Sequence, residues 1–421
     1  MKLKNNLVGI VLLLIISSLL IFYQFSQIPK YLAFDEVEFT KLALSLDGKP
    51  YTSYSLLATG HSTLYFYILL ASLKIFGVNI FALRFPAAIF GILSVIMFYL
   101  IIKIVFQQFF PFLFTLIFLS SRWFLNFSRF AFEPTFLLFL ELTSIYFLLR
   151  SIDTSKYWYL IFSGIFAGLV FNSYTPGRIF FLLPLFFLTL KTLQTLKLYK
   201  LTYFIIPFLI TITPLTSYLS THKETRINQQ FFLRNSEMII NEKANGLWHN
   251  ISSTALMFFT KGDMNGRHNY PGKPALNPVL GILFVAGLIV SIKNIKNFYN
   301  QFFLSYFFLS LFPALMTYHW ENPNMLRTFT VIPSVVYFVG QGIIVIARSE
   351  TTKQSLKLLR LPRSLWSLAM TVVIVFLILL SSLYELRTYF KYQAKVFQDS
   401  FEIHYPLEKA IKLKNPYEKN Q

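Results

Sequence analysis

The chain contains 421 residues, of which 55% are hydrophobic, 49 are phenylalanine and only 13% are charged. Because apolar runs of membrane-spanning length recur along it, the composition predicts a polytopic membrane protein and excludes a soluble one. The net charge of +20 comes mainly from Lys and Arg at the ends of these runs. That pattern sets orientation in a bilayer and argues against nucleic-acid binding. Cysteine is absent, which excludes a disulfide, a thiolate nucleophile and a cysteine-ligated metal.

The N-terminus has the charge order of a signal peptide, with Lys2 and Lys4 ahead of an apolar run at 7–25. This run is too long for a signal peptide, and no small-residue cleavage site follows it. We therefore expect an uncleaved first span that starts in the cytoplasm.

Ten further apolar runs of helical length follow, so the sequence predicts an all-α bundle of about eleven transmembrane helices. The eleven runs lie at about 7–25, 84–105, 109–124, 133–149, 157–174, 178–193, 200–220, 276–292, 299–318, 328–347 and 365–384. The connectors expected in the cytoplasm are short and basic. They carry Lys191, Lys197 and Lys200; Lys293 and Lys296; and Arg348, Lys353, Lys357, Arg360 and Arg363.

One more apolar run, 62–76, is short and contains Lys74. If it crossed the bilayer, every later basic connector would face outward. We therefore predict that it is an interfacial helix within a first external loop, residues 26–83. The predicted transmembrane domain covers 1–385, with a second long external loop at 221–275.

Residues 386–421 form a short extracytoplasmic tail in this topology. The tail is too short for a core of its own. It either docks on the membrane domain or belongs to something truncated.

Three acids, Asp35, Glu36 and Glu38, lie within four positions directly after the first span. Asp35, Glu38 and Lys41 fall at helical spacing, as in an amphipathic helix that lies along a surface. A purely structural explanation is a capping box, in which Asp35 caps the helix and Glu38 reaches back to its amide. A catalytic explanation depends on the other external segments.

Three of those segments carry charged groups. Arg129 and Glu133 lie four residues apart before Pro134, which suits the first turn of a helix. They form either a helix-start ion pair or part of a site. In the Gly- and Pro-rich stretch 261–274, Arg267 and His268 are donors suited to an anion, although the stretch could also be only a turn-rich return to the membrane.

The third segment is 319–327, where Arg327 lies at the mouth of the next span. Its guanidinium could reach a lipid phosphate or hold a substrate phosphate. Residues 174–178, which end in Arg178, repeat this pattern more weakly. Glu141 lies inside a predicted span, where a carboxylate is costly and is either functional or buried with a partner.

The order of these segments resembles that of the GT-C glycosyltransferases, and most of all the protein mannosyltransferase and aminoarabinose transferase branch. The resemblance starts from the acidic pair Asp35-Glu36 after the first span, Gly60-His61 before an aromatic helix, and residues 83–91 opening a span. Residues 128–133, the loop 262–274 and the stretch from 321 to 327 continue it. The likeness covers most of residues 1–385, and its specificity lies in the order of degenerate motifs.

Two features depart from that family. Members often have a Pro-rich stretch after the Gly-His or Gly-Lys of the first loop, where this chain has Ser62-Thr63. The chain also lacks the folded lumenal insert of the protein mannosyltransferases. The acceptor is therefore left open as a protein, a lipid or a glycan.

The resemblance implies an enzyme that takes a sugar from a polyprenyl-phosphate carrier and transfers it, with inversion, on the far side of the plasma membrane. Asp35, of the Asp35-Glu36 pair, would be the general base. Glu133 matches the second external acid of the family, which could orient the acceptor or help to hold a divalent metal ion with Asp35 and His61. The spacing of these three residues does not require a metal.

We expect the cations on the same face to stabilise the departing lipid phosphate. This expectation rests on charge and side, and the residues are His61, Arg129, Arg267, His268 and Arg327. Two other functions stay open. A flippase for lipid-linked glycans would use the same cations and Glu141, but the sequence lacks the mid-membrane breaks and related halves typical of transporters. A non-catalytic subunit of an envelope complex would keep the fold for binding only.

Overall fold

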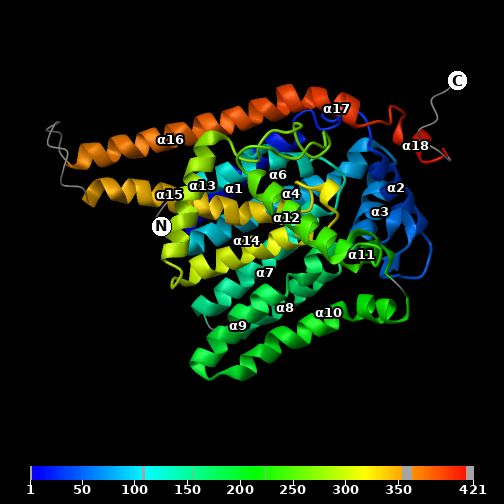
Figure 1. Ribbon diagram of the computed structural model, residues 1–421, viewed down its shortest axis with the longest axis horizontal. Coiled ribbons are helices and arrows are strands. Elements are labelled where there is room, and N and C mark those ends of the chain that lie inside the picture. Colours follow the sequence, from blue (N-terminus) through cyan, green and yellow to red (C-terminus); the bar gives the residue numbers. More distant parts are fainter. Residues whose placement is uncertain (1, 107–109, 155, 223, 353–362, 414–421) are drawn as a thin grey trace.

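A computed structural model describes residues 2–106, 110–154, 156–222, 224–352 and 363–413. Long helices that run in similar directions form the bundle, and a second group of shorter elements gathers at one of its ends (Figure 1). Within the described residues, paired strands are limited to a two-residue hairpin, β1 (Tyr54–Ser55) with β2 (His61–Ser62), and two isolated bridges. The prediction of an all-α membrane bundle is confirmed.

The bundle follows the predicted apolar runs, each of which overlaps a helix. Its helices are α1 (Lys2–Phe22), α4 (Ile80–Val105), α5 (Pro111–Ser120), α6 (Arg122–Phe127), α7 (Pro134–Thr154), α8 (Tyr157–Phe171), α9 (Leu182–Thr195), α10 (Thr202–Thr221), α13 (Pro278–Lys293), α14 (Phe298–Leu315), α15 (Ile332–Thr352) and α16 (Arg363–Arg387). Six helical segments of the described chain are long and apolar enough to cross a membrane, and several shorter apolar helices accompany them. The count of eleven spans stays a prediction.

Shorter elements connect and cover the bundle. They are α2 (Phe34–Ser45), η1 (Leu57–Thr59), α3 (Leu64–Phe76), η2 (Thr175–Ile179), η3 (Leu198–Leu201), α11 (Thr225–Gln230), η4 (Phe232–Arg234), α12 (Ile240–Leu256), η5 (His319–Glu321), η6 (Phe329–Val331), η7 (Thr388–Gln393), α17 (Ala394–Ser400) and α18 (Leu407–Ala410).

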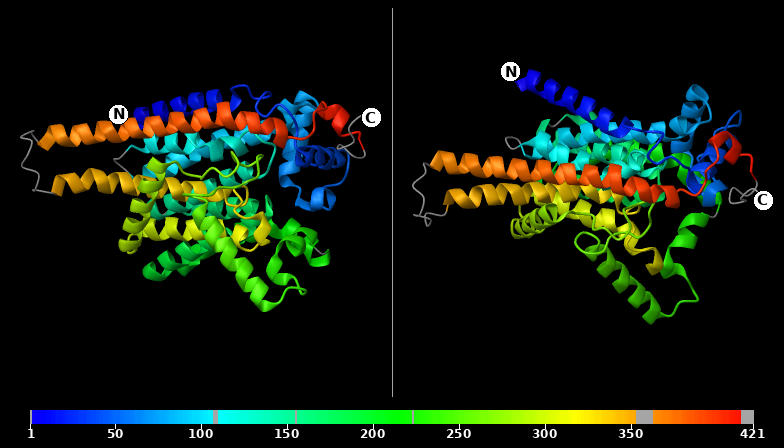
Figure 2. Two further views of the ribbon diagram at one scale, coloured as in Figure 1. Left: turned by 45° about the horizontal axis from the view of Figure 1, so that its top comes forward. Right: turned by 90° about the horizontal axis from the view of Figure 1, so that it is seen from above.

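The two ends of the bundle differ in what they carry. The α9–α10 and α13–α14 connections lie at the end where α1 begins, at the left of Figure 1. The opposite end holds α2, α3, α17 and α18, and Figure 2 shows the same separation from two other directions. The third basic connector, at 353–362, lies outside the described residues. Which end faces the cytoplasm, and the interfacial position of α3, stay predictions.

Helix α2 does not start with the predicted capping box. It begins at Phe34, and the backbone N–H of Ala33 donates to Glu36 Oε2 at 3.1 Å. Glu38 instead pairs with Lys41 at 2.9 Å. The predicted capping box of Asp35 and Glu38 is therefore wrong: the helix begins two residues earlier than predicted, with Ala33 and Glu36 in those positions. Asp35 does not cap the helix.

Glu36 forms the central ion pair of this end of the protein. Its carboxylate accepts from Arg84 Nε at 2.7 Å and from Arg84 Nη2 at 2.8 Å, and both side chains are fully buried. The remaining Arg84 donors reach the carbonyls of Pro29 and Tyr31, at 2.5 and 2.7 Å. The same carboxylate also accepts the backbone N–H of Ala131 at 3.2 Å. One buried pair thus joins the first loop, α4 and the segment before α7.

The C-terminal segment docks on the first loop. Leu32 and Ile403 exchange two backbone hydrogen bonds, at 3.1 and 3.0 Å, and Glu402 Oε1 accepts the N–H of Phe34 at 3.1 Å. The His404 ring stacks on Tyr31 with centroids 3.9 Å apart. The chain that follows α17 therefore covers the start of α2. Residues 414–421 lie outside the described part of the tail.

We expect Glu36→Ala to lower the free energy of unfolding by about 3–5 kcal/mol, because it leaves the Arg84 guanidinium buried without its counter-charge. Chemical denaturation in detergent micelles measures this loss. Glu38→Ala is the matched control in the same helix: its pair with Lys41 is partly exposed and contributes at most about 1 kcal/mol. Equal losses in the two variants would contradict the assignment.

Candidate active site

Helix α6 positions the loop at 261–274. Arg122 donates to Glu385 Oε2 at 2.6 Å and to the carbonyls of Lys273 and Pro274. One turn later, Asn126 Nδ2 donates to the carbonyl of Arg267 at 2.8 Å. The two buried side chains therefore hold the C-terminal end of the loop and its middle, at Arg267.

Asp263 fastens the same loop from inside. Its carboxylate accepts the backbone N–H of Met325 at 2.9 Å and lies 3.0 Å from His268 Nδ1. Gly262 is needed at the base of the loop because a Cβ there would lie 1.9 Å from the Lys273 carbonyl oxygen. The loop is thus tied to the segment that leads to Arg327.

Asp35 lies in the first turn of α2 and faces this loop. Arg267 Nη1 donates to Asp35 Oδ2 at 3.0 Å, and the Asp35 side chain is 42% exposed. Glu36, its neighbour in the sequence, is fully buried. Asp35 is therefore an oriented carboxylate that a ligand can still reach.

Glu133 lies on the segment that enters α7 and contacts the first loop. Its Oε1 is 2.8 Å from His61 Nδ1, and both side chains are buried. Arg226 Nη1 lies against the same imidazole, 2.5 Å from His61 Nε2 and 2.8 Å from Nδ1. A neutral imidazole with its proton on Nδ1 can donate to Glu133 and accept from Arg226 at Nε2. The second Glu133 oxygen has no hydrogen-bond partner among the described residues.

The Tyr174 hydroxyl shows which of these charges share one neighbourhood. Burial raises the pKa of Tyr174, and four charged side chains then act on it. The carboxylates Glu133 and Asp35 raise this pKa further, whereas the guanidinium groups Arg226 and Arg327 lower it. Charges from four distant parts of the chain therefore act on one tyrosine, and the Arg226 guanidinium lies over its ring, 5.3 Å from the centroid.

An apolar cavity opens beside this cluster. Its volume is about 190 Å³, and Tyr174 and Arg327 line it together with apolar side chains of η2, α11 and α14. These apolar residues include Ile179, Ile227 and Phe312. A charged rim next to an apolar cavity suits a ligand with an anionic head and a hydrocarbon tail.

Four of the residues singled out from the sequence are held in other contacts. Arg129 donates to four carbonyls, those of Leu20, Ile21, Gln24 and Ile28. These carbonyls lie at and just beyond the end of α1, so the guanidinium caps that helix and its Nη donors are not available to a phosphate. His268 is held by Asp263, Glu36 by Arg84, and Glu141 accepts from Tyr306 at 2.6 Å between α7 and α14.

A divalent metal does not fit the groups present. No cluster of three or more His, Asp or Glu side chains occurs among the residues that the structure describes. His61 and Glu133 do meet, but Arg226 lies against the imidazole, and Asp35 is paired with Arg267. A guanidinium in that position repels a cation, so we assign no step to a metal.

Sequence reasoning missed two members of the cluster, Arg226 and Tyr174. Arg226 lies in α11, five residues after the end of α10, in a stretch without a recognisable motif. The available signal was a basic residue close to Glu224, which itself pairs with Arg178. The sequence places Tyr174 only at the start of the stretch that ends in Arg178.

The pH dependence of stability should report on His61. Burial lowers the pKa of His61, Glu133 raises it in part, and Arg226 lowers it again. The unfolded chain therefore takes up this proton at higher pH than the folded one, so stability falls as the pH drops below about 6.5.

Thermal unfolding in detergent between pH 8 and 5 tests this expectation. We expect His61→Asn to flatten the decline relative to the wild type, whereas His249→Asn, at an exposed position in α12, should keep it. A wild-type profile that does not change over this range would contradict the buried neutral imidazole.

Part of the chain is similar in sequence to a known family. Residues 60–218 match the family model described as dolichyl-phosphate-mannose-protein mannosyltransferase. No curated protein matches the chain in sequence.

The fold is similar to that of solved membrane proteins. The crystal structure of ArnT from Cupriavidus metallidurans bound to undecaprenyl phosphate superposes with a TM-score of 0.56 and 12% identity, over 93% of this chain and 76% of ArnT. Its apo state gives a TM-score of 0.53 over the same shares, also at 12% identity.

A third match is the oligosaccharyltransferase from Archaeoglobus fulgidus, in complex with Zn and sulfate. Its TM-score is 0.50 at 14% identity, over 93% of this chain and 53% of that protein. The resemblance predicted from the sequence is thereby confirmed: the chain has the fold of the GT-C membrane glycosyltransferases.

Proposed function

We propose that this chain is an integral-membrane glycosyltransferase that moves a sugar, with inversion, from a polyprenyl-phosphate carrier to an acceptor on the extracytoplasmic side. The observation that carries the proposal is the contrast among the acids of the site. Glu36 and Glu133 are almost fully buried in contacts with Arg84 and His61, whereas Asp35 is oriented by Arg267 and remains 42% exposed. A base must reach its proton, and Asp35 has that access.

Asp35 removes the proton from the acceptor hydroxyl as that oxygen attacks the anomeric carbon. The bond from this carbon to the carrier phosphate breaks on the opposite face, so the configuration inverts in one displacement. Asp35 keeps the proton, and the carrier leaves as a polyprenyl phosphate with the bonding electron pair. Arg267 orients the base before the reaction.

Arg226 and Arg327 meet the negative charge that grows on the departing phosphate. Both act on the Tyr174 hydroxyl together with Asp35, which supports a common site. Cations fixed in a partly dry cleft stabilise such a charge more strongly than they would in water. His61 and Glu133 hold Arg226 in place through the imidazole.

The apolar cavity beside Tyr174 would hold the first isoprene units of the carrier. Ile179, Ile227 and Phe312 supply its hydrocarbon walls, and Arg327, whose Nη1 pairs with Glu321, supplies a guanidinium at its rim. ArnT, which has a similar fold, was crystallised with undecaprenyl phosphate. A carrier of that chemistry suits a cavity with one charged edge.

Asp35→Asn should leave the protein folded and lower sugar transfer by about 10²–10⁴-fold, because the amide cannot accept the acceptor proton. The measurement incubates purified protein with a panel of undecaprenyl-phosphate sugars and lipid, glycan and peptide acceptors. Asp47→Asn is the matched control, since Asp47 lies just after α2 and pairs with the exposed Lys74. Full transfer by Asp35→Asn would remove Asp35 from the mechanism.

Arg226→Gln should lower kcat by about 10²–10³-fold, because a neutral amide cannot stabilise the phosphate charge. Arg234→Gln is the control, at an exposed position in the same external loop. Similar losses in both variants would show that the effect is not local to the site.

The same panel separates an enzyme from a flippase. Transfer consumes the donor and releases the carrier phosphate, with the anomeric configuration of the product inverted. A protein that moves intact donor between leaflets of a proteoliposome, without consuming any sugar of the panel, would contradict the proposal.

A further inference from the structure

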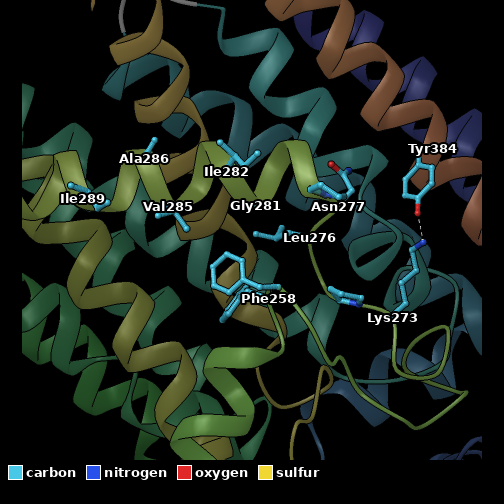
Figure 3. A pocket seen from close by; sticks show the side chains of 13 residues that line it. Phe258, Lys273, Leu276, Asn277, Gly281, Ile282, Val285, Ala286, Ile289 and Tyr384 are labelled. Atoms are coloured by element: carbon cyan, nitrogen blue, oxygen red, sulfur yellow. Dashed lines mark hydrogen bonds between the residues drawn. The ribbon is translucent and has the colours of Figure 1, made fainter.

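A second groove, separate from the charge cluster, runs along α13 on the outside of the bundle. Its volume is about 760 Å³, and Figure 3 shows its wall of aliphatic side chains along α13 with Phe258 opposite. Ile282 and Ile289 are exposed by 69% and 47%, so the groove faces the surroundings of the helix. In a bilayer, lipid acyl chains cover such a surface, and the groups at its polar end determine which lipid headgroup binds there.

The end of the groove near the start of α13 is cationic. Figure 3 shows Lys273 and Tyr384 pointing toward each other, and Lys273 Nζ donates to the tyrosine oxygen at 2.6 Å. The same two residues line an adjoining cavity of about 300 Å³, which Arg387 and Tyr392 also border. Arg387 Nη2 donates to the Tyr392 hydroxyl at 3.0 Å. The two cavities therefore meet at a pair of cations with tyrosine hydroxyls around them.

These cations lack carboxylate partners. Among the described residues, neither Lys273 nor Arg387 forms an ion pair, and the residues described as lining the two cavities include no Asp or Glu. The nearby Glu385 is occupied by Arg122 and Asn277. Helix α13 also begins at this end, at Pro278, with the positive end of its dipole. The local field favours an anion.

We propose that the groove between α13 and α16 binds an anionic phospholipid, with a fatty-acyl chain along α13 and the phosphate between Lys273 and Arg387. Charge complementarity selects the headgroup, because a headgroup whose only charge is the phosphodiester can pair with both Lys273 and Arg387. The tyrosine hydroxyls of Tyr384 and Tyr392 supply neutral donors at the same level. Since the lining carries no carboxylate to act as a base, the groove binds lipid and does not react with it.

Native mass spectrometry of the full chain tests this site with phosphatidylglycerol and phosphatidylcholine of equal chain length. We expect the wild type to retain phosphatidylglycerol preferentially. The double variant Lys273→Ala/Arg387→Ala should weaken this binding by about 25-fold, about fivefold for each cation. Lys293→Ala, at the other end of α13, should bind as the wild type does.

A second variant tests the apolar part. A Cβ at Gly281 would make only ordinary contact, 3.6 Å from the Phe259 ring, so Gly281→Leu fits the fold and fills the groove. It should displace the lipid while both cations remain. Equal retention of the two lipids by the wild type, unchanged binding in the double variant, or preferential capture of added undecaprenyl phosphate would overturn the assignment.

Discussion

The arrangement of the candidate active site depends on the buried ion pair of Glu36 and Arg84. The Glu36 carboxylate accepts hydrogen bonds from the Arg84 guanidinium and from the backbone N–H of Ala33, just before α2. It also accepts the backbone N–H of Ala131, two residues before Glu133. An unpaired charge at this depth would cost much free energy. The start of α2, α4 and the segment before α7 therefore cannot separate without leaving one charge of the pair buried and unpaired, or exposing it. The positions of Asp35 and Glu133 relative to each other follow from this constraint.

A second set of buried polar groups extends the constraint to the far loops. Arg122 and Asn126 project from one face of α6 and bind the loop that carries Arg267, while Asp263 ties the same loop to Met325. Most of these bonds satisfy backbone carbonyls or amides that have no partner in a helix. Irregular backbone near a membrane is tolerated where buried side chains meet its polar groups, and α6 provides them.

Hydrophobic periodicity predicted the helices well, since each apolar run in the sequence overlaps a helix of the bundle. The roles of individual cations were harder to predict. Arg129 was expected to meet a phosphate, yet its Nη donors reach the carbonyls at the end of α1, a contact between segments about a hundred positions apart. Arg226 had no motif around it and gains its role only through contact with His61. A sequence pattern indicates the charge of a residue and the side of the membrane on which it is expected. It does not indicate which long side chain donates its hydrogen bonds to backbone carbonyls.

Asp35 and Glu36 show how one helix gives neighbouring acids different duties. Successive residues of a helix point about 100° apart, so at the start of α2 one side chain turns into the protein and the next toward the loop of Arg267. The buried Glu36 carboxylate fixes the helix by accepting four hydrogen bonds, two from Arg84 and one each from the backbone N–H groups of Ala33 and Ala131. Asp35 keeps its exposure because that anchoring is already done. A reachable carboxylate can then hold one orientation on a short surface helix, which a general base requires.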